Sequence, residues 1–147
     1  MIFIAHNADE TREIGRKIAE KLHTGAIKSV YIAMRGEMGV GKTAFVSGFA
    51  SFFGITGVKS PTYAVMNQYS NGGVTIRHFD MYRITDEDDL YSIGYDDYVG
   101  AVGYNIVEWS ENIEYAIPES AIYVGIERMA ESDEYRKITV TGGDMEA

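Results

Sequence analysis

Apolar side chains recur with helical spacing near the start of the chain. Between residues 9 and 22 they stand four positions apart among charged residues, as in an amphipathic helix; they are Ile14, Ile18 and Leu22. Asn7, followed three positions later by Glu10, resembles a capping box, which fixes where such a helix begins. The pattern therefore predicts a helix over residues 9–22.

Two further segments have the composition of helices. Residues 43–53 are rich in Ala and Phe and are followed by Gly54, a common helix stop. Residues 86–91 form an acidic segment that predicts a short helix, and Pro118 marks a break in the chain.

Short apolar runs between these segments predict strands. They lie at residues 2–5, 30–34, 63–69, 74–79, 104–109, 121–127 and 136–141. Between the third and fourth runs, Ser-Asn-Gly-Gly at 70–73 is a strong hairpin signal, because Asn and Gly adopt positive φ at low cost. Residues 142–147 are expected to form a flexible tail.

Strands interleaved with a few helices predict an α/β domain with a central sheet. The hairpin requires at least one antiparallel pair, so we expect a mixed sheet. A length of 147 residues suits one domain covering 1–147, and no repeat or Pro-rich linker divides the chain. The chain has no cysteine, which excludes disulfides, thiolate metal sites and a Cys nucleophile.

Charge narrows the function classes. The chain has 13 Lys+Arg and 22 Asp+Glu, a net charge of −9. Phosphate contacts dominate nucleic-acid affinity, so we expect no strong binding of RNA or DNA by the chain alone, whereas a basic protein partner suits it. The longest uncharged run, 44–58, is shorter than the ~20 apolar residues of a membrane span. We expect a cytoplasmic protein without membrane association.

One segment carries a phosphate-binding motif. Residues 36–43 read G-E-M-G-V-G-K-T, which fits G-x-x-x-x-G-K-[ST]. Glycines let backbone N–H groups wrap around a phosphate, and the following helix adds its N-terminal dipole. Lys42 would bind the β- and γ-phosphates and the Thr43 hydroxyl Mg²⁺. A strand before and a helix after the motif are the context it needs, and together they predict a three-layer domain like those of P-loop NTPases.

Two predicted strands end in an acid, as a nucleotide-hydrolysing site requires. Asp80 follows one strand like a Walker-B acid, and alternation places it on the same side as Ile76 and His78. Asp80 either binds the metal or caps a turn. Glu108 shares the metal, polarises the attacking water, or is a solvated acid at a strand end.

Two other features each allow two interpretations. His78 is a metal ligand or base, or it is a hydrogen-bonded structural residue, as most single histidines are. The acidic run at 86–89 is a solvated face or a docking patch for a basic partner.

Several short motifs, taken in order, resemble those of the bacterial tRNA threonylcarbamoyladenosine biosynthesis ATPases, the TsaE (YjeE) family. They are Thr11, the loop at 36–43, S-P-T-Y at 60–63, H-F-D-M-Y-R at 78–83 and V-E-W at 107–109. Each short motif is weak alone, but the ordered combination is specific and spans nearly the whole chain.

This resemblance implies a small ATPase that acts with two partners, TsaB and TsaD, in making N6-threonylcarbamoyladenosine at position 37 of tRNAs reading ANN codons. TsaD carries the transferase chemistry, and the ATPase binds the TsaB–TsaD heterodimer. ATP hydrolysis supports turnover or resetting. The chain would reach tRNA only indirectly, through the complex.

The resemblance also implies roles for individual residues. The catalytic set is Lys42, Asp80 and Glu108, and the magnesium ligands are Thr43, Asp80 and Glu108. The residues implied to bind ATP or ADP are Thr11, Glu37, Met38, Gly39, Val40, Gly41, Lys42, Thr43, Ala44, Ser60, Thr62, Trp109 and Arg136. Thr11 would lie near the base, and the loop at 60–62 would act like a switch. Either Arg128 or Arg136 matches the family's late arginine.

The sequence also allows other functions to be weighed against this ATPase. A small-molecule P-loop kinase is disfavoured because the arginines are few and no lid-like insertion is present. A GTPase is disfavoured because the chain has no N-K-x-D guanine-reading tetrapeptide. A nucleotide-sensing module without useful turnover differs from the ATPase only in whether both strand-end acids lie near the metal.

Overall fold

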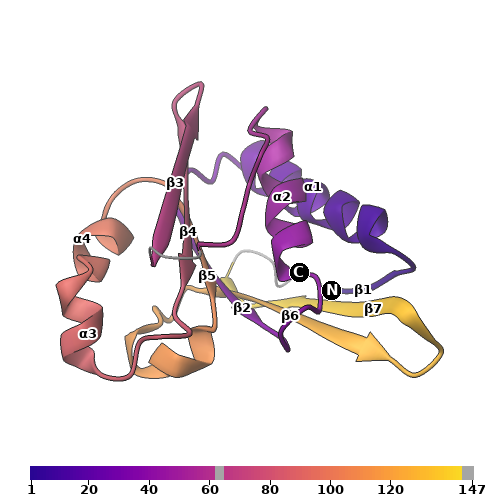
Figure 1. Ribbon diagram of the computed structural model, residues 1–147. Coiled ribbons are helices and arrows are strands. Elements are labelled where there is room, and N and C mark those ends of the chain that lie inside the picture. Colours follow the sequence, from indigo (N-terminus) through magenta and orange to yellow (C-terminus); the bar gives the residue numbers. More distant parts are fainter. Residues whose placement is uncertain (62–64, 144–147) are drawn as a thin grey trace.

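The computed structural model describes residues 1–61 and 65–143, and within them seven strands form one sheet (Figure 1). The strands are β1 (Ile2–Ala5), β2 (Val30–Arg35), β3 (Met66–Asn71), β4 (Val74–Asp80), β5 (Tyr104–Glu108), β6 (Ile122–Met129) and β7 (Ser132–Thr141). The helices are α1 (Ala8–Thr24), α2 (Lys42–Phe52), α3 (Glu87–Ser92), α4 (Tyr95–Gly100) and the 3₁₀ helix η1 (Ser110–Ala116). Thr62, Tyr63 and residues 144–147 of the predicted tail lie outside the described residues.

The sheet is mixed, as the sequence predicts, with strand order β1-β7-β6-β2-β5-β4-β3. β2 runs parallel to β5 and β6, and β4 runs parallel to β5. The outer pairs β1–β7, β6–β7 and β3–β4 are antiparallel. Parallel strands end at the same edge of a sheet, so β2, β4 and β5 bring their C-terminal residues together there.

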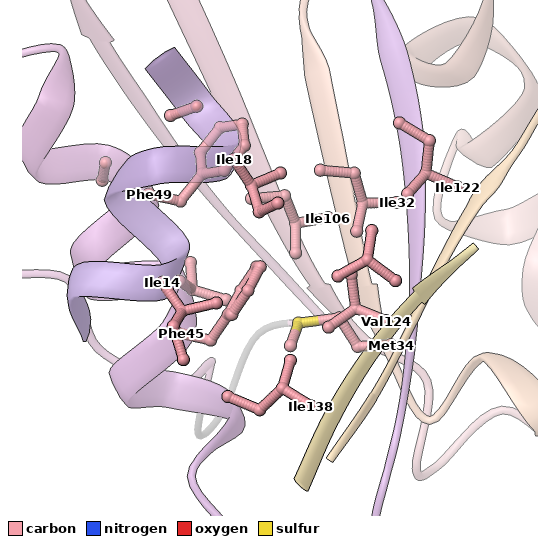
Figure 2. Close-up of a cluster of buried hydrophobic side chains, with 14 of the residues drawn as sticks. Ile14, Ile18, Ile32, Met34, Phe45, Phe49, Ile106, Ile122, Val124 and Ile138 are labelled. Atoms are coloured by element: carbon pink, nitrogen blue, oxygen red, sulfur yellow. The ribbon is translucent and has the colours of Figure 1, made fainter. Parts of the chain in front are cut away.

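Alternation along the strands creates two cores and three layers. In β2, Ile32 and Met34 join the core shared with α1 and α2, whereas Tyr31 and Ala33 join the core shared with α3, α4 and η1. Figure 2 shows the first core, with Phe45 of α2 packed towards these β2 side chains. The α/β three-layer prediction is therefore confirmed (Figure 1).

Close packing of α1 on α2 depends on two glycines. A Cβ on Gly48 would lie 1.8 Å from the carbonyl oxygen of Arg12, and one on Gly15 would lie 2.2 Å from that of Phe45. Real side chains cannot occupy those positions, so the two backbones approach as closely as they do only because both residues lack a Cβ. This contact fixes where the first turn of α2 sits.

The predicted start of the first helix is confirmed with one difference. The Glu10 N–H donates to Asn7 Oδ1 over 2.9 Å, as in a capping box. The Glu10 carboxylate, however, accepts from the backbone N–H of His6 rather than from Asn7. The hairpin is also found, with Gly72 and Gly73 at positive φ between β3 and β4.

Several boundaries differ from the sequence-based predictions. β7 begins at Ser132 rather than 136, because it pairs with β6 across a tight turn despite its polar start. β3 begins at Met66, after Val65, whose carbonyl accepts the N–H of Asp80. α4 and η1 were not predicted, since both are short and lack an apolar period. Within the described residues, no helix combines the length and apolarity that crossing a bilayer requires.

Candidate functional site

The loop between β2 and α2 is built on glycines with positive φ. Gly36, Gly39 and Gly41 have φ of 153°, 75° and 119°. Gly36 has a second constraint, because a Cβ there would lie 2.7 Å from the Ile126 carbonyl oxygen. Residues with side chains rarely adopt such backbone conformations, so the motif's glycines are required by the path of the loop.

Lys42 is held inside the loop that it follows. Lys42 is the first residue of α2, and it is only 5% exposed. Nζ donates to the Gly36 carbonyl over 2.7 Å and lies 4.5 Å from the centroid of the Trp109 ring. An ammonium group has three donor hydrogens, so Lys42 brings a fixed positive charge with further donor capacity to this position.

The Thr43 hydroxyl connects the loop to the segment that was predicted to act as a switch. Its Oγ1 lies 2.5 Å from Ser60 Oγ, a hydrogen-bonding distance. Ser60 and Thr43 are 17 positions apart, and sequence reasoning did not predict this bond. Thr62, the other expected residue of that segment, lies outside the described residues.

Asp80 and Glu108 lie side by side at the ends of β4 and β5, where they are register partners in a parallel pair. Asp80 Oδ1 accepts from the Tyr82 N–H over 2.9 Å, so Asp80 does cap a turn, and its role as a metal ligand stays a prediction. Glu108 is buried and hydrogen-bonded to Nε2 of His78, so it is not a solvated strand-end acid. The hydrogen-bonded interpretation of His78 likewise agrees with the structure.

Most of the expected residues share one pocket of about 310 Å³ at the C-terminal edge of the parallel strands. Its lining is Met38, Gly39, Gly41, Lys42, Thr43, Ala44, Ser60, Asp80, Glu108 and Trp109. One cation, two hydroxyls and two carboxylates therefore face a common space. Oxygen donors of this kind suit Mg²⁺, which prefers carboxylates, hydroxyls and phosphate oxygens. Within the described residues, no group of three or more His, Cys, Asp or Glu side chains forms a metal cluster.

A second pocket of about 220 Å³ lies on the other side of the loop. It is lined by Asn7, Ala8, Thr11, Gly39, Val40, Gly41, Ala44, Asp133, Glu134 and Arg136. Thr11, Val40 and Arg136 are therefore found here rather than in the first pocket, and Glu37 lines neither. Sequence reasoning missed Asp133 and Glu134, for which the chain offers no signal beyond their place before Arg136.

Both late arginines hold the loop through backbone carbonyls. Arg136 Nε donates to the Val40 carbonyl over 2.8 Å, and an Arg128 guanidinium nitrogen donates to the Met38 carbonyl over 3.1 Å. Arg128 also lies 3.6 Å from the Glu37 carboxylate. Arg136 lines the second pocket, whereas Arg128 lines neither of the two pockets described above, so Arg136 is the arginine that we carry forward as the candidate nucleotide contact.

The acidic run at 86–89 has a structural role at one position. Asp86 caps α3 by accepting from the Asp89 N–H over 2.8 Å, while Glu87 and Asp88 are exposed. The docking interpretation of this run stays a prediction.

The chain is similar to known proteins over most of its length. A family model described as "Threonylcarbamoyl adenosine biosynthesis protein TsaE" matches residues 5–138. The chain belongs to the TsaE family. The TsaE proteins of Bacillus subtilis and Haemophilus influenzae are 35% and 38% identical to it, over 92% and 77% of this chain and 81% and 73% of theirs.

The fold agrees with that membership. A crystal structure of Bacillus subtilis YdiB superposes with a TM-score of 0.78 at 28% identity, covering 97% of this chain and 84% of that one. The curated TsaE relatives are named as tRNA threonylcarbamoyladenosine biosynthesis proteins. The family resemblance seen in the sequence is thus confirmed.

Proposed function

We propose that this TsaE-family protein binds ATP with Mg²⁺ and hydrolyses it as an accessory subunit of the complex that makes N6-threonylcarbamoyladenosine at position 37 of tRNAs reading ANN codons. The observation that carries the proposal is the pocket in which Lys42 and Thr43 of the phosphate loop face Asp80 and Glu108. A glycine loop alone would bind phosphate, whereas two strand-end acids beside it supply what hydrolysis adds.

In this proposal the loop binds the phosphates and the acids complete the site. Backbone N–H groups of the loop, the α2 dipole and the Lys42 ammonium attract the negative charge. The oxygens of Thr43 and Asp80 would hold Mg²⁺, which when bound would neutralise charge on the β- and γ-phosphate oxygens, while Glu108 faces the same space. Trp109 lines the pocket, with its ring 4.5 Å from the Lys42 Nζ.

Glu108 is the residue that we assign to the attacking water. Its carboxylate is buried, lines the pocket and is held by His78, so one oxygen remains to accept a proton from water at the phosphate. Asp80 already caps its own turn through one oxygen, which suits it better to the metal than to proton transfer. The nucleoside would extend towards the second pocket, past Thr11 and Arg136.

The names of the relatives support the tRNA role, and the partners are part of the same proposal. Their printed names support a part in threonylcarbamoyladenosine biosynthesis, and we propose TsaB- and TsaD-like proteins as the partners. A net charge of −9 supports contact with tRNA through partners rather than directly. A cytoplasmic location is part of the same proposal.

The first test is nucleotide binding by Lys42→Ala. ATP affinity measured by calorimetry with Mg²⁺ should be lost, because each hydrogen bond to a charged group contributes about 1.5–3 kcal/mol and an ammonium makes several. Lys17→Ala, an exposed lysine of α1, is the matched control and should bind like the wild type. Wild-type affinity in a folded Lys42→Ala protein would contradict the proposal.

The second test is reconstitution of the tRNA modification with TsaB- and TsaD-like proteins. Multiple-turnover product should require this chain, and the Lys42→Ala variant should not replace it. Phosphorylation of a small-molecule acceptor without any effect on the tRNA product would favour the kinase alternative instead.

A further inference from the structure

We infer that His78 is a positioning residue: it donates from Nε2 to one oxygen of Glu108 and so fixes the carboxylate that faces the pocket. The inference deepens the proposed function, since it assigns an orientation to the residue that acts on water. It is separate from phosphate binding, because His78 does not line the pocket.

The sheet brings the two residues together. β4 and β5 are parallel neighbours in which His78 pairs with Ile106, two positions before Glu108. The His78 side chain is 0% exposed and that of Glu108 is 7% exposed, and Nε2 contacts Oε2 within hydrogen-bonding distance. A carboxylate in such a place is not reoriented by solvent, so its direction is set by this partner.

The second ring nitrogen indicates which atom donates. Within residues 1–61 and 65–143, Nδ1 of His78 is buried without a hydrogen-bond partner. An ionised carboxylate only accepts, so the proton of a neutral imidazole belongs on Nε2, where it is used. The alternative tautomer would bury an unpaired N–H donor and set two acceptors against each other. The geometry thus favours the Nε2–H form, with Oε1 of Glu108 left for the pocket.

Two substitutions that keep an amide separate orientation from simple packing. His78→Gln places an N–H donor where Nε2 stands, whereas His78→Asn places one near Nδ1, out of reach of Glu108. Loss of such an outer partner typically lowers activity about 10–100-fold. We expect kcat to fall to this extent in His78→Asn, with affinity for Mg²⁺ and ATP nearly unchanged. His78→Gln should retain most of the wild-type kcat.

Ile76→Val is the matched control, since Ile76 is buried on the same side of β4 and touches neither pocket. It should hydrolyse ATP like the wild type. Equal kcat for the Gln and Asn variants would overturn the inference while leaving the proposed function standing. A wild type that hydrolyses no ATP, even with TsaB- and TsaD-like proteins, would remove both.

A spectroscopic test needs no nucleotide or metal. Ring ¹⁵N chemical shifts of His78 in the free protein report whether Nε2 or Nδ1 carries the proton. We expect the Nε2–H tautomer, and His6 and His23, which are outside the pair, give the internal comparison. The Nδ1–H tautomer in the folded protein would overturn the inference.

Discussion

The side chains of the candidate site are each held by a specific partner. Lys42 is held by the Gly36 carbonyl and Glu108 by His78, while Thr43 lies against Ser60. Groups fixed in this way need little reorganisation when charge develops nearby, which is the usual source of electrostatic stabilisation in enzymes. At the scale of single residues, the pocket therefore holds its polar and charged side chains in fixed orientations rather than offering an apolar binding surface.

Glu108→Gln tests the role of one carboxylate. Gln keeps the size of Glu but cannot take a proton, and general-base assistance typically contributes 10²–10⁴-fold, so phosphate release should fall by about that factor. ATP affinity measured by calorimetry should stay close to the wild-type value. Glu111→Gln, an exposed acid on η1, should release phosphate normally. Unchanged turnover in Glu108→Gln would leave Glu108 with a structural role only.

A pair of buried tyrosines predicts how the stability of the protein responds to alkaline pH. Tyr31 and Tyr95 belong to the core on the face of the sheet opposite α1 and α2. The Tyr31 and Tyr95 hydroxyls lie 2.8 Å apart, and Tyr95 also donates to the Ala116 carbonyl. Burial raises the pKa of Tyr95 to about 12 and raises the pKa of Tyr31 as well.

The sign of the effect follows from which state ionises first. Unfolded tyrosines ionise near pH ~10, whereas the folded pair stays neutral, so the stabilisation is complete below about pH 10 and is lost as pH rises towards 12. Urea midpoints should therefore fall across this window, and fall less in Tyr95→Phe. A constant midpoint in the wild type would contradict the prediction.

At the scale of elements, the α1–α2 contact supports the phosphate loop. α2 begins at Lys42, immediately after the phosphate loop. The position at which α2 packs on α1 therefore determines where the loop lies relative to the edge of the sheet. At Gly48, α2 lies directly against the backbone of α1 at Arg12.

Gly48→Ala should destabilise the protein. The added methyl would meet the Arg12 carbonyl at 1.8 Å, and such overpacking typically costs about 1–3 kcal/mol, measurable as a lower free energy of unfolding in urea. Gly125→Ala in β6 is the control, since a Cβ there meets nothing within 4 Å. Equal stabilities of the two variants would show that α1 and α2 can separate at little cost.

Local patterns were enough to predict most elements. The four-residue spacing in α1 and the Asn-Gly-Gly turn between β3 and β4 act over a few positions, so the sequence displays them directly. α4 and the early part of β7 were missed, because one is a single short helix after Gly94 and the other is polar and depends on pairing with β6.

The site was predictable only in part for the same reason. The phosphate loop is a contiguous motif, and strand-end acids follow from where strands stop. The bonds Thr43–Ser60 and His78–Glu108 join residues 17 and 30 positions apart. They depend on the strand order β2-β5-β4, which no local pattern contains.

At the scale of the whole molecule, charge governs which partners bind. Acids exceed bases by 22 to 13, and the exposed faces of α3 and α4 carry acids in their first turns. Such a net negative charge disfavours contact with polyphosphates such as RNA.

The isolated chain should accordingly bind tRNA no better than weakly. Filter retention at physiological salt should give affinity weaker than micromolar, because few cations are available to release counterions from the phosphates. The same assay on the assembled complex serves as the positive control. Micromolar or tighter retention by the chain alone would contradict this prediction.

Trp109 is the only tryptophan in the chain, and it stands against the Lys42 ammonium and 5.0 Å from the Tyr82 ring. The protein therefore carries a built-in optical reporter at its pocket. When the protein is excited at wavelengths longer than those that tyrosine absorbs, its fluorescence comes from Trp109 alone. That emission responds to any movement of the neighbouring Lys42 ammonium. Occupancy can thus be followed in real time, without a label, in the free chain and in any assembly whose other members lack tryptophan.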